Sequence, residues 1–378
     1  MFKKVLLGGS ALASVAVLAL PTHAGQVGSK DAMSVTLGGE FRFNIGFIDQ
    51  DVSAMRGRGY QFLVDDSEIK IKASNTADNG IKYGVGVELN AGAGDTSAAD
   101  EAYAYLDSDS WGRVEMGDQD DVTDRMHIAA HNILVGRAGA DGDPADFIGF
   151  GTGSGISAPG VDSTSDDTKI SYFSPRFFSF RVGASLTPDS GATSGGAATA
   201  DSDADGNFEN VLGLAANYSG NFDDVAIEVG IIGEFGDSET AGGAATEGEI
   251  ETIGVGATVE FAGFGIGAEY VDFAEKGVAE ATRTAGGDAG SYYQLGVAYK
   301  TGPWGVSLGW FDSSVSNPTG SGGDTDINIL SFDASYDVAP GWELMASLHL
   351  AEGDNINATA IEVDNDGTAF VISNQFDF

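Results

Sequence analysis

Residues 250–273 read IETIGVGATVEFAGFGIGAEYVDF, and the fold class can be inferred from this stretch. Between Ile253 and Phe261 every second residue is apolar, and the residues between them are glycine, threonine or glutamate. A tight connection at Ala262 and Gly263 follows, after which the alternation resumes. A period of two predicts a pair of antiparallel β-strands with one apolar face and one polar face.

The same alternation continues along the chain and predicts sixteen strands, with short connections alternating with long polar ones. The predicted strands are residues 34–47, 59–74, 80–90, 100–107, 111–118, 168–174, 177–187, 208–218, 222–235, 250–261, 263–273, 291–300, 303–312, 327–337, 341–351 and 366–378. An even number of antiparallel strands of about ten residues, with short turns at one end and long loops at the other, is typical of a transmembrane β-barrel. We therefore predict an all-β fold, a sixteen-stranded antiparallel barrel that is too wide to be filled by its own side chains.

The composition agrees with this fold and excludes several functions. The 378 residues include 56 Gly and no Cys, with 57 acidic against 18 basic residues and a formal net charge of −39. The absence of Cys excludes disulfide scaffolds, thiol catalysis and cysteine metal sites. The excess of acids argues against a nucleic-acid partner, because binding to phosphate backbones depends on clustered Lys and Arg.

The first 24 residues predict a secretory signal peptide. Lys3 and Lys4 precede the apolar run Val5–Leu20, and a proline and small residues follow up to Ala24. This order of basic, apolar and small residues is typical of a cleaved leader. We expect residues 25–378 to form a single barrel domain. An N-terminal membrane anchor is the weaker alternative, because the apolar run is short.

Two residue classes have predicted places in the barrel wall. Aromatic residues near strand ends are expected in the interfacial girdles: Tyr292, Tyr293, Tyr299, Trp304, Trp310, Tyr336 and Trp342. Glycines recur on the polar face: Gly84, Gly86, Gly254, Gly256, Gly265 and Gly267. They either keep the channel wall thin or allow the sheet to curve tightly, and the sequence leaves both roles open.

The final residues, 368–378, alternate up to a terminal Phe378. Together with the leader, a first strand at 33–47, the hairpins at 67–90 and 101–118, and the long loop that follows, they resemble the general bacterial porins of the Gram-negative outer membrane, in particular the alphaproteobacterial branch. The resemblance implies short periplasmic turns and long external loops. It also implies a homotrimer in contact with outer-membrane lipid and lipopolysaccharide, an assembly machinery that reads Phe378, and no required cofactor.

This resemblance also implies a function, namely passive diffusion of small hydrophilic solutes and ions through a water-filled channel. In that family the third external loop folds into the barrel and narrows it, and here it would span residues 118–168. The loop carries the acids Asp118, Asp120, Asp121, Asp124, Asp141, Asp143 and Asp146. Alternation points five bases of the early strands into the lumen: Arg42, Lys70, Lys72, Lys82 and Arg113.

A basic wall opposite an acidic loop would create a field across the pore. Two alternatives stay open. The loop acids would merely keep an exposed loop soluble, or Glu40, Glu68, Glu88 and Glu115, on the same face as the bases, would pair with them locally and dilute the field. The overall excess of acids predicts a preference for cations.

Three acidic tracts suggest calcium binding: residues 201–209, with Asp201, Asp203 and Asp205, and residues 141–146 and 364–367. The first resembles the opening of an EF-hand loop, but its twelfth position is Leu212 instead of glutamate, so looser calcium or magnesium bridging between loops or to lipopolysaccharide phosphates is expected.

An enzyme finds little support. His127 and His131 have the spacing of a metal pair but no third ligand, which favours a packing or pore-lining role. Ser347 and His349 share the inward face and are the one Ser–His pair worth testing. Two alternative functions remain: a substrate-specific outer-membrane channel, which would need a line of aromatics in the lumen, and a secreted β-sandwich or adhesin.

Overall fold

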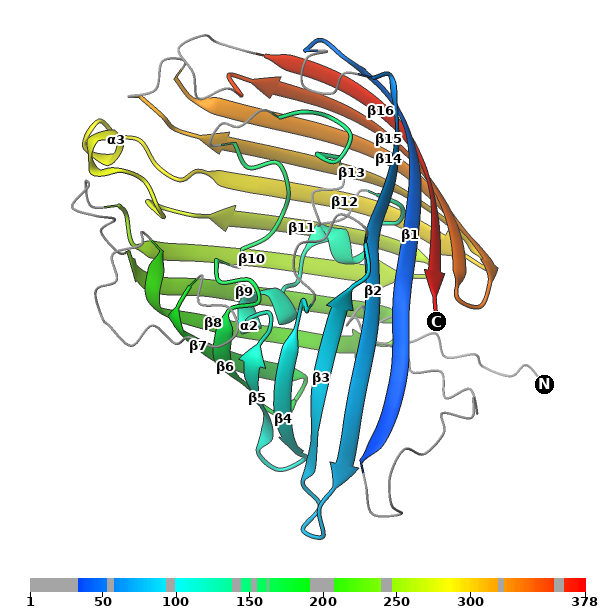
Figure 1. Ribbon diagram of the computed structural model, residues 1–378. Coiled ribbons are helices and arrows are strands. Elements are labelled where there is room, and N and C mark those ends of the chain that lie inside the picture. Colours follow the sequence, from blue (N-terminus) through cyan, green and yellow to red (C-terminus); the bar gives the residue numbers. More distant parts are fainter. Residues whose placement is uncertain are drawn as a thin grey trace.

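The computed structural model describes residues 33–52, 58–92, 99–137, 144–150, 155–161, 163–190, 207–238, 247–318, 323–356 and 364–378. Sixteen strands lie in these residues, each antiparallel to the next, and β16 pairs with β1 to close a barrel (Figure 1). The strands are β1 (Ser34–Gln50), β2 (Tyr60–Thr76), β3 (Lys82–Asn90), β4 (Ala102–Ser108), β5 (Gly112–Asp118), β6 (Thr168–Phe173), β7 (Phe180–Asp189), β8 (Phe208–Phe222), β9 (Val225–Ser238), β10 (Ile250–Phe261), β11 (Phe264–Asp272), β12 (Ser291–Thr301), β13 (Trp304–Val315), β14 (Thr325–Ala339), β15 (Trp342–Asp354) and β16 (Asn365–Asp377).

All sixteen predicted strands are confirmed, and the closure of β16 on β1 overturns the β-sandwich alternative. The differences lie at strand ends. Residues 219–221 were expected in a turn but extend β8, and the turn falls on Asp223 and Asp224, where Asp223 has a φ of 52°. Aspartate tolerates this left-handed conformation better than most residues, so the chain can reverse there without glycine.

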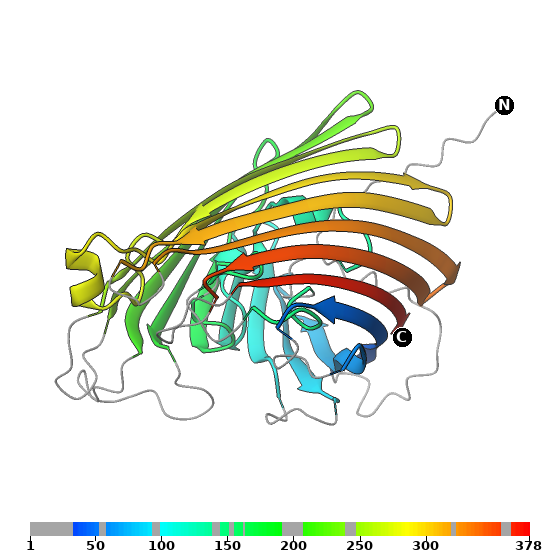
Figure 2. The same ribbon diagram turned by 90° about the horizontal axis from the view of Figure 1, so that it is seen from above.

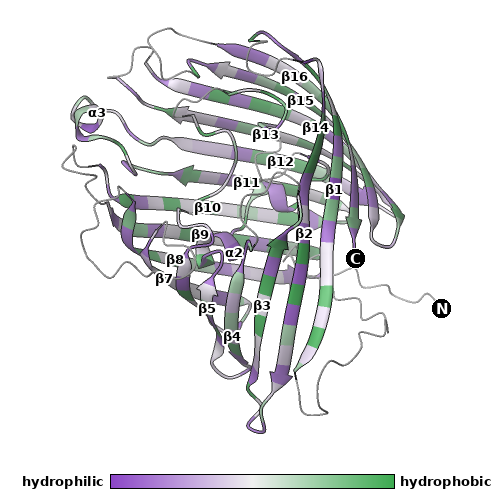
Figure 3. Cartoon of the chain, viewed as in Figure 1, coloured by the Kyte–Doolittle hydropathy of each residue, from purple (hydrophilic) through white to green (hydrophobic). Residues whose placement is uncertain are grey.

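The barrel wall alternates between an apolar outer face and a polar inner face (Figure 3). On β13 the outward side chains Trp304, Val306 and Leu308 are 58%, 50% and 42% exposed, whereas the inward Ser307 is 9% exposed. Tyr293 also faces outward, but Tyr292 is fully buried inside the barrel. Placing Tyr292 in an interfacial girdle was therefore wrong, because adjacent residues of a strand face opposite sides.

The short turns and the long connections lie at opposite ends of the barrel. Figure 2 shows the hairpin turns of β8–β9, β10–β11 and β12–β13 at one end and the helix α3 (Glu280–Thr284) at the other. Two further short helices, α2 (Val122–Arg125) and η1 (Ala130–Asn132), lie inside the barrel (Figure 1). Among the described residues no helix is long and apolar enough to cross a membrane.

The C-terminus completes the closure of the barrel. Phe378 and Gly39 exchange two backbone hydrogen bonds, with N···O distances of 2.9 and 3.0 Å. A Cβ at Gly39 would lie 2.8 Å from the ring of Phe378, so glycine leaves the space that this ring occupies. The terminal phenylalanine is thus part of the β1–β16 seam, with its side chain 68% exposed.

The pore loop comprises residues 119–167 between β5 and β6, and its described residues run along the inside of the wall. Its first half crosses seven consecutive strands, β7 to β13, and meets an inward glycine on each of them. We call these residues the glycine row: Gly183, Gly213, Gly230, Gly256, Gly267, Gly296 and Gly305. A Cβ at Gly267 would lie 2.7 Å from the Cα of Ala130, and one at Gly256 would clash with the carbonyl oxygen of Ile128. The glycines therefore allow the loop backbone to approach the wall.

These contacts favour close approach as the role of the inward glycines. Gly256, Gly265 and Gly267 make room for the pore loop, Gly84 and Gly86 make room for tyrosine rings of β4, and Gly254 makes room for the side chains of Ile232 and Val271 on the neighbouring strands.

Polar side chains of the wall then bind the loop backbone. Ser307 accepts a hydrogen bond from the backbone N–H of Val135 at 3.0 Å, and Ser347 accepts one from that of Arg137 at 2.9 Å. Glu234 accepts one from the N–H of Ser163 at 2.8 Å, on the returning half of the loop. These contacts satisfy backbone groups that the lumen would otherwise leave unpaired.

We expect Gly256→Val to displace the pore loop, because the new side chain would overlap the Ile128 carbonyl; such overpacking costs about 1–3 kcal/mol. Trypsin should then cleave within the loop, at Arg125 or Arg137, faster than in the wild-type barrel. Ala257→Val is the matched control, since the neighbouring residue faces outward. Equal cleavage rates in both variants would contradict the role given to the glycine row.

Candidate functional site

A cavity of about 1070 Å³ lies between the pore loop and the inner faces of strands β1 to β9. Its described lining is strongly charged, with both signs present. The basic residues are Arg42, Lys70, Lys72, Arg113, Arg125, Arg176 and Arg181, and the acidic residues are Glu68, Glu88, Asp100, Glu101, Glu115, Asp120, Asp124, Asp166 and Glu228. A polar lumen of this kind is suited to hydrated solutes and unsuited to apolar ones.

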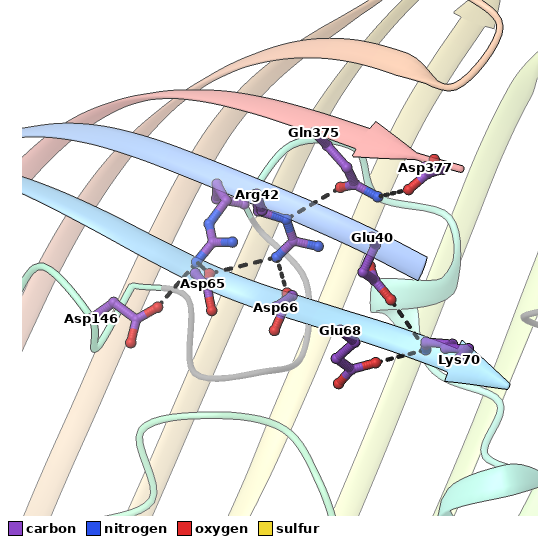
Figure 4. A network of polar contacts seen from close by, with 10 residues as sticks. Glu40, Arg42, Asp65, Asp66, Glu68, Lys70, Asp146, Gln375 and Asp377 are labelled. Carbon is purple, nitrogen blue, oxygen red and sulfur yellow. Dashed lines mark hydrogen bonds and ion pairs between the residues drawn. The ribbon is translucent and has the colours of Figure 1, made fainter. Parts of the chain in front are cut away.

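Lys70 is surrounded by three carboxylates on neighbouring strands. Its Nζ lies 3.1 Å from Glu40 on β1, 2.8 Å from Glu68 on β2 and 3.1 Å from Glu88 on β3. Antiparallel register places Glu40 opposite Glu68 and Lys70 opposite Glu88, so all four side chains meet on the inner face. Figure 4 shows Lys70 with Glu40 and Glu68. This part of the predicted basic wall therefore has more negative than positive charge.

Arg42 belongs to a second network, which joins the wall to the pore loop. It pairs with Asp66 and, at 3.6 Å, with Asp65 (Figure 4). The register of β1 and β2 shifts between Glu40 and Arg42, and Asp66 has a φ of 44°, so this bulge brings two consecutive aspartates to one guanidinium.

The pore loop enters this network through Arg137. Its Nη2 lies 2.6 Å from Asp65 and 3.0 Å from Asp146, and its side chain is 1% exposed. The Arg137 guanidinium thus links the loop to the bulge of β2.

The three other bases predicted for the pore wall, Lys72, Lys82 and Arg113, do not all lie in the cavity. Lys72 and Arg113 line the cavity. Lys82 does not: its side chain is 57% exposed and lies 3.7 Å from Asp109, in the short turn between β4 and β5. This position follows from Lys82 being the first residue of β3, at the short-turn end of the barrel.

The predicted loop acids also separate into groups. Asp120 and Asp124 line the cavity, and Asp146 pairs with Arg137. Asp121 is buried as the N-cap of α2, where it accepts hydrogen bonds from the backbone of Thr123 and Asp124, and Asp118 accepts one from Thr168 at the end of β5. Asp141 and Asp143 lie outside the described residues, as do residues 1–24 and the calcium candidates Asp201, Asp203 and Asp205.

Glu101, just ahead of β4, is a further acidic residue of the cavity, and the sequence pattern does not single it out. Its carboxylate and those of Asp120 and Asp166 have oxygens within 4.8 Å of one another. Burial and the negative charge of Glu88 raise the pKa of Glu101 to about 7. This carboxyl therefore changes its charge near neutral pH, inside the cavity.

The two histidines of the pore loop hold the loop to the wall. His127 Nε2 lies 2.7 Å from Glu269, which also accepts a hydrogen bond from Tyr292, and the His131 backbone donates to Gln294 at 2.9 Å. Burial acts to lower the pKa of His127, but the hydrogen bond and charge of Glu269 outweigh it and raise this pKa.

Ser347 and His349 face inward, as predicted, and both are fully buried. Ser347 binds the Arg137 backbone, while His349 Nδ1 lies 2.8 Å from Ser331. The pair is therefore engaged in holding the loop and the wall, and the serine and histidine are not hydrogen-bonded to each other in the described contacts.

Several of these residues were missed from sequence because they act through contacts between distant segments. Arg137 reaches Asp65 across a β-bulge that alternation does not reveal. The alternation of inward and outward residues along a strand could have placed Glu269 and Arg181 on the inner face, since each lies between outward apolar neighbours.

Comparisons with known proteins agree with this architecture. The sequence model of the Gram-negative porins matches residues 11–356. No curated protein sequence matches the chain. Among solved structures, the anion-selective porin from Comamonas acidovorans is similar with a TM-score of 0.63 and 15% identity, covering 92% of this chain and 100% of that chain. The trimer form of the outer membrane protein OmpT of Vibrio cholerae has a TM-score of 0.58 and 15% identity, with coverage of 92% and 100%.

At these identities the solved structures support the fold alone, a closed barrel like theirs. The family match covers nearly the whole barrel and the pore loop within it. The chain therefore belongs to the Gram-negative porin family, and its barrel is an outer-membrane channel.

Proposed function

We propose that this porin allows passive diffusion of small hydrophilic solutes and ions, with a preference for cations. The observation that carries the proposal is the charge of the cavity lining. Lys70 is outnumbered by Glu40, Glu68 and Glu88, and on the loop side Glu101 lies among further carboxylates. Fixed negative charge around a narrow aqueous path raises the local cation concentration and lowers that of anions.

The fold by itself leaves the sign of the preference open. The Comamonas acidovorans neighbour is described as anion-selective, although its barrel is similar. The local ion pairs of Arg42 and Lys70 also dilute any field between a basic wall and an acidic loop, which was one of the two alternatives from sequence. The proposal therefore depends on the excess of carboxylates around the paired bases.

Further parts of the proposal concern assembly. A homotrimer is supported by the trimer form of the similar OmpT. We also propose cleavage of the leader after Ala24, reading of Phe378 by the assembly machinery, and contact of the apolar outer face with lipid and lipopolysaccharide. Calcium at Asp201, Asp203 and Asp205 stays a prediction.

A substrate-specific channel is the second candidate. It would need Phe, Tyr or Trp rings along the solute path, and among the described cavity residues only Tyr103 and Phe173 are of these types. Both are almost fully buried, so they offer little ring surface to a solute. The lining therefore favours the non-specific pore.

The sign of selectivity is tested by the reversal potential of single channels in a KCl gradient. We expect the wild-type channel to favour K⁺ and the double variant Glu68→Gln/Glu88→Gln to lose about fivefold in permeability ratio, since one charge at about 4 Å contributes about 1 kcal/mol even in water. Glu249→Gln, in an exposed external segment, should change little. A wild-type channel that favours Cl⁻ would overturn the proposed preference.

Selectivity should also depend on pH through Glu101. The pKa of this carboxyl is about 7, so raising the pH from about 6 to about 8 adds a negative charge to the cavity and should increase the preference for K⁺. In Glu101→Gln this increase should be strongly reduced. If the pH dependence is the same in Glu101→Gln as in the wild type, another group is responsible.

A further inference from the structure

Four arginines converge at the end of the cavity near the short turns. Arg113 lies on β5 and Arg181 on β7, Arg176 lies in the turn between β6 and β7, and Arg125 comes from the pore loop. All four line the same cavity, together with Phe173 at the end of β6. The resemblance to porins implies that the short turns are periplasmic, and with this orientation the group lies at the periplasmic mouth of the pore.

Aromatic rings orient three of the guanidiniums. The Cζ of Arg181 lies 5.0 Å and that of Arg125 5.5 Å from the centre of the Phe173 ring, and the Cζ of Arg113 lies 4.0 Å from that of Tyr105. Such cation–π contacts use the face of the guanidinium and leave its N–H edge available. That edge matches the two oxygens of a carboxylate or phosphate.

The positive charge of this group is only partly compensated. The buried Glu115 pairs with Arg113 and, at 3.1 Å, with Arg125. Arg176 donates to Asn217 Oδ1 at 3.1 Å, and Arg181 donates to the backbone oxygen of Ser174 at 3.3 Å. Within the described part of the chain, neither of these two arginines forms an ion pair.

Other charges act on the group from the surrounding elements. The charge of Arg181 is repelled by Arg176, Arg125 and Arg113 and attracted by Glu115. Glu228 of β9 lines the same cavity, where it accepts a hydrogen bond from Ser219 at 2.7 Å. Glu101 and Asp120 also attract Arg125, so the positive charge that neighbouring carboxylates leave least compensated is that of Arg176 and Arg181.

We propose that Arg113, Arg176 and Arg181 form a binding subsite for small oxyanions, namely carboxylates or phosphate, at the periplasmic mouth of the pore. An oxyanion there would replace the missing negative charge and accept charge-assisted hydrogen bonds. The subsite rests on the proposed pore function, but its sign is opposite to that of the Lys70 region. The lumen would thus hold a cation-favouring segment and, beyond it, a local site for anions.

Arg176 and Arg181 allow a test that leaves the pore loop in place, because their hydrogen bonds are with the wall and the β6–β7 turn. The experiment measures block of the KCl current in planar bilayers when succinate or inorganic phosphate is added to one chamber at a time. In the wild type the half-blocking concentration should differ between the two sides, because the subsite lies near one mouth.

The double variant Arg176→Gln/Arg181→Gln should raise the lower half-blocking concentration roughly tenfold, the effect expected from losing a hydrogen bond to a charged group. It should also remove the difference between sides. Lys300→Gln is the matched control, since Lys300 of β12 faces inward opposite Gly305 at the same end of the barrel as the arginines. This variant should keep the wild-type asymmetry of block.

Block by both probes supports an oxyanion subsite. Block that is symmetric in the wild type, or unchanged in the double variant, overturns it. The KCl current without probe tests the pore separately: a protein with no channel activity would contradict the proposed function, whereas an open channel without asymmetric block would contradict the subsite alone.

Discussion

The contact between the pore-loop backbone and the glycine row is the constraint on which the lumen depends. Side chains at those positions would hold the loop away from the wall, and a Cβ at Gly256 or Gly267 would already overlap main-chain atoms. Because the loop lies this close, serine and glutamate side chains of the wall can reach its N–H groups. The remaining space between the loop and strands β1 to β9 is the cavity. Close backbone approach therefore determines where the solute path runs.

The charges of the cavity are arranged in local clusters. Lys70 has three carboxylates within about hydrogen-bonding distance, and Arg42 shares Asp65 with Arg137 of the loop. Each cluster satisfies its buried or half-buried charges, which would otherwise be costly to desolvate. A cluster with unequal numbers of acids and bases still has a net charge, and this net charge is what a passing ion meets. The described ion pairs are thus local, and the field expected from sequence between a basic wall and an acidic loop stays a prediction.

Much of the fold was predictable because alternation is a local property of the chain. The alternation seen in β10 and β11 recurs in the other strands of the barrel. It also correctly predicted that Ser347 and His349 face inward. Tyr292 was misplaced because a girdle was inferred from proximity to a strand end and not from parity.

The site was less predictable, since it depends on which distant segments meet. Nothing in the local sequence shows that Arg137 reaches Asp65, that Glu101 lies beside Asp166, or that Arg181 shares an aromatic ring with Arg125. These contacts follow from the path of the pore loop, and the glycines that permit this path look alike whether they serve curvature or close approach.

The glycine row has a consequence for how the sequence of such a channel can change during evolution. The aperture depends on glycine positions of β7 to β13 where a side chain would crowd the pore loop, whereas the fixed charge around Lys70 depends on side chains of β1 to β3. These two sets of residues do not overlap. Exchanging Glu68 or Glu88 would alter which ions are favoured while the loop stays in place and the bore is kept. Size exclusion and ion preference can thus change independently of each other in one barrel.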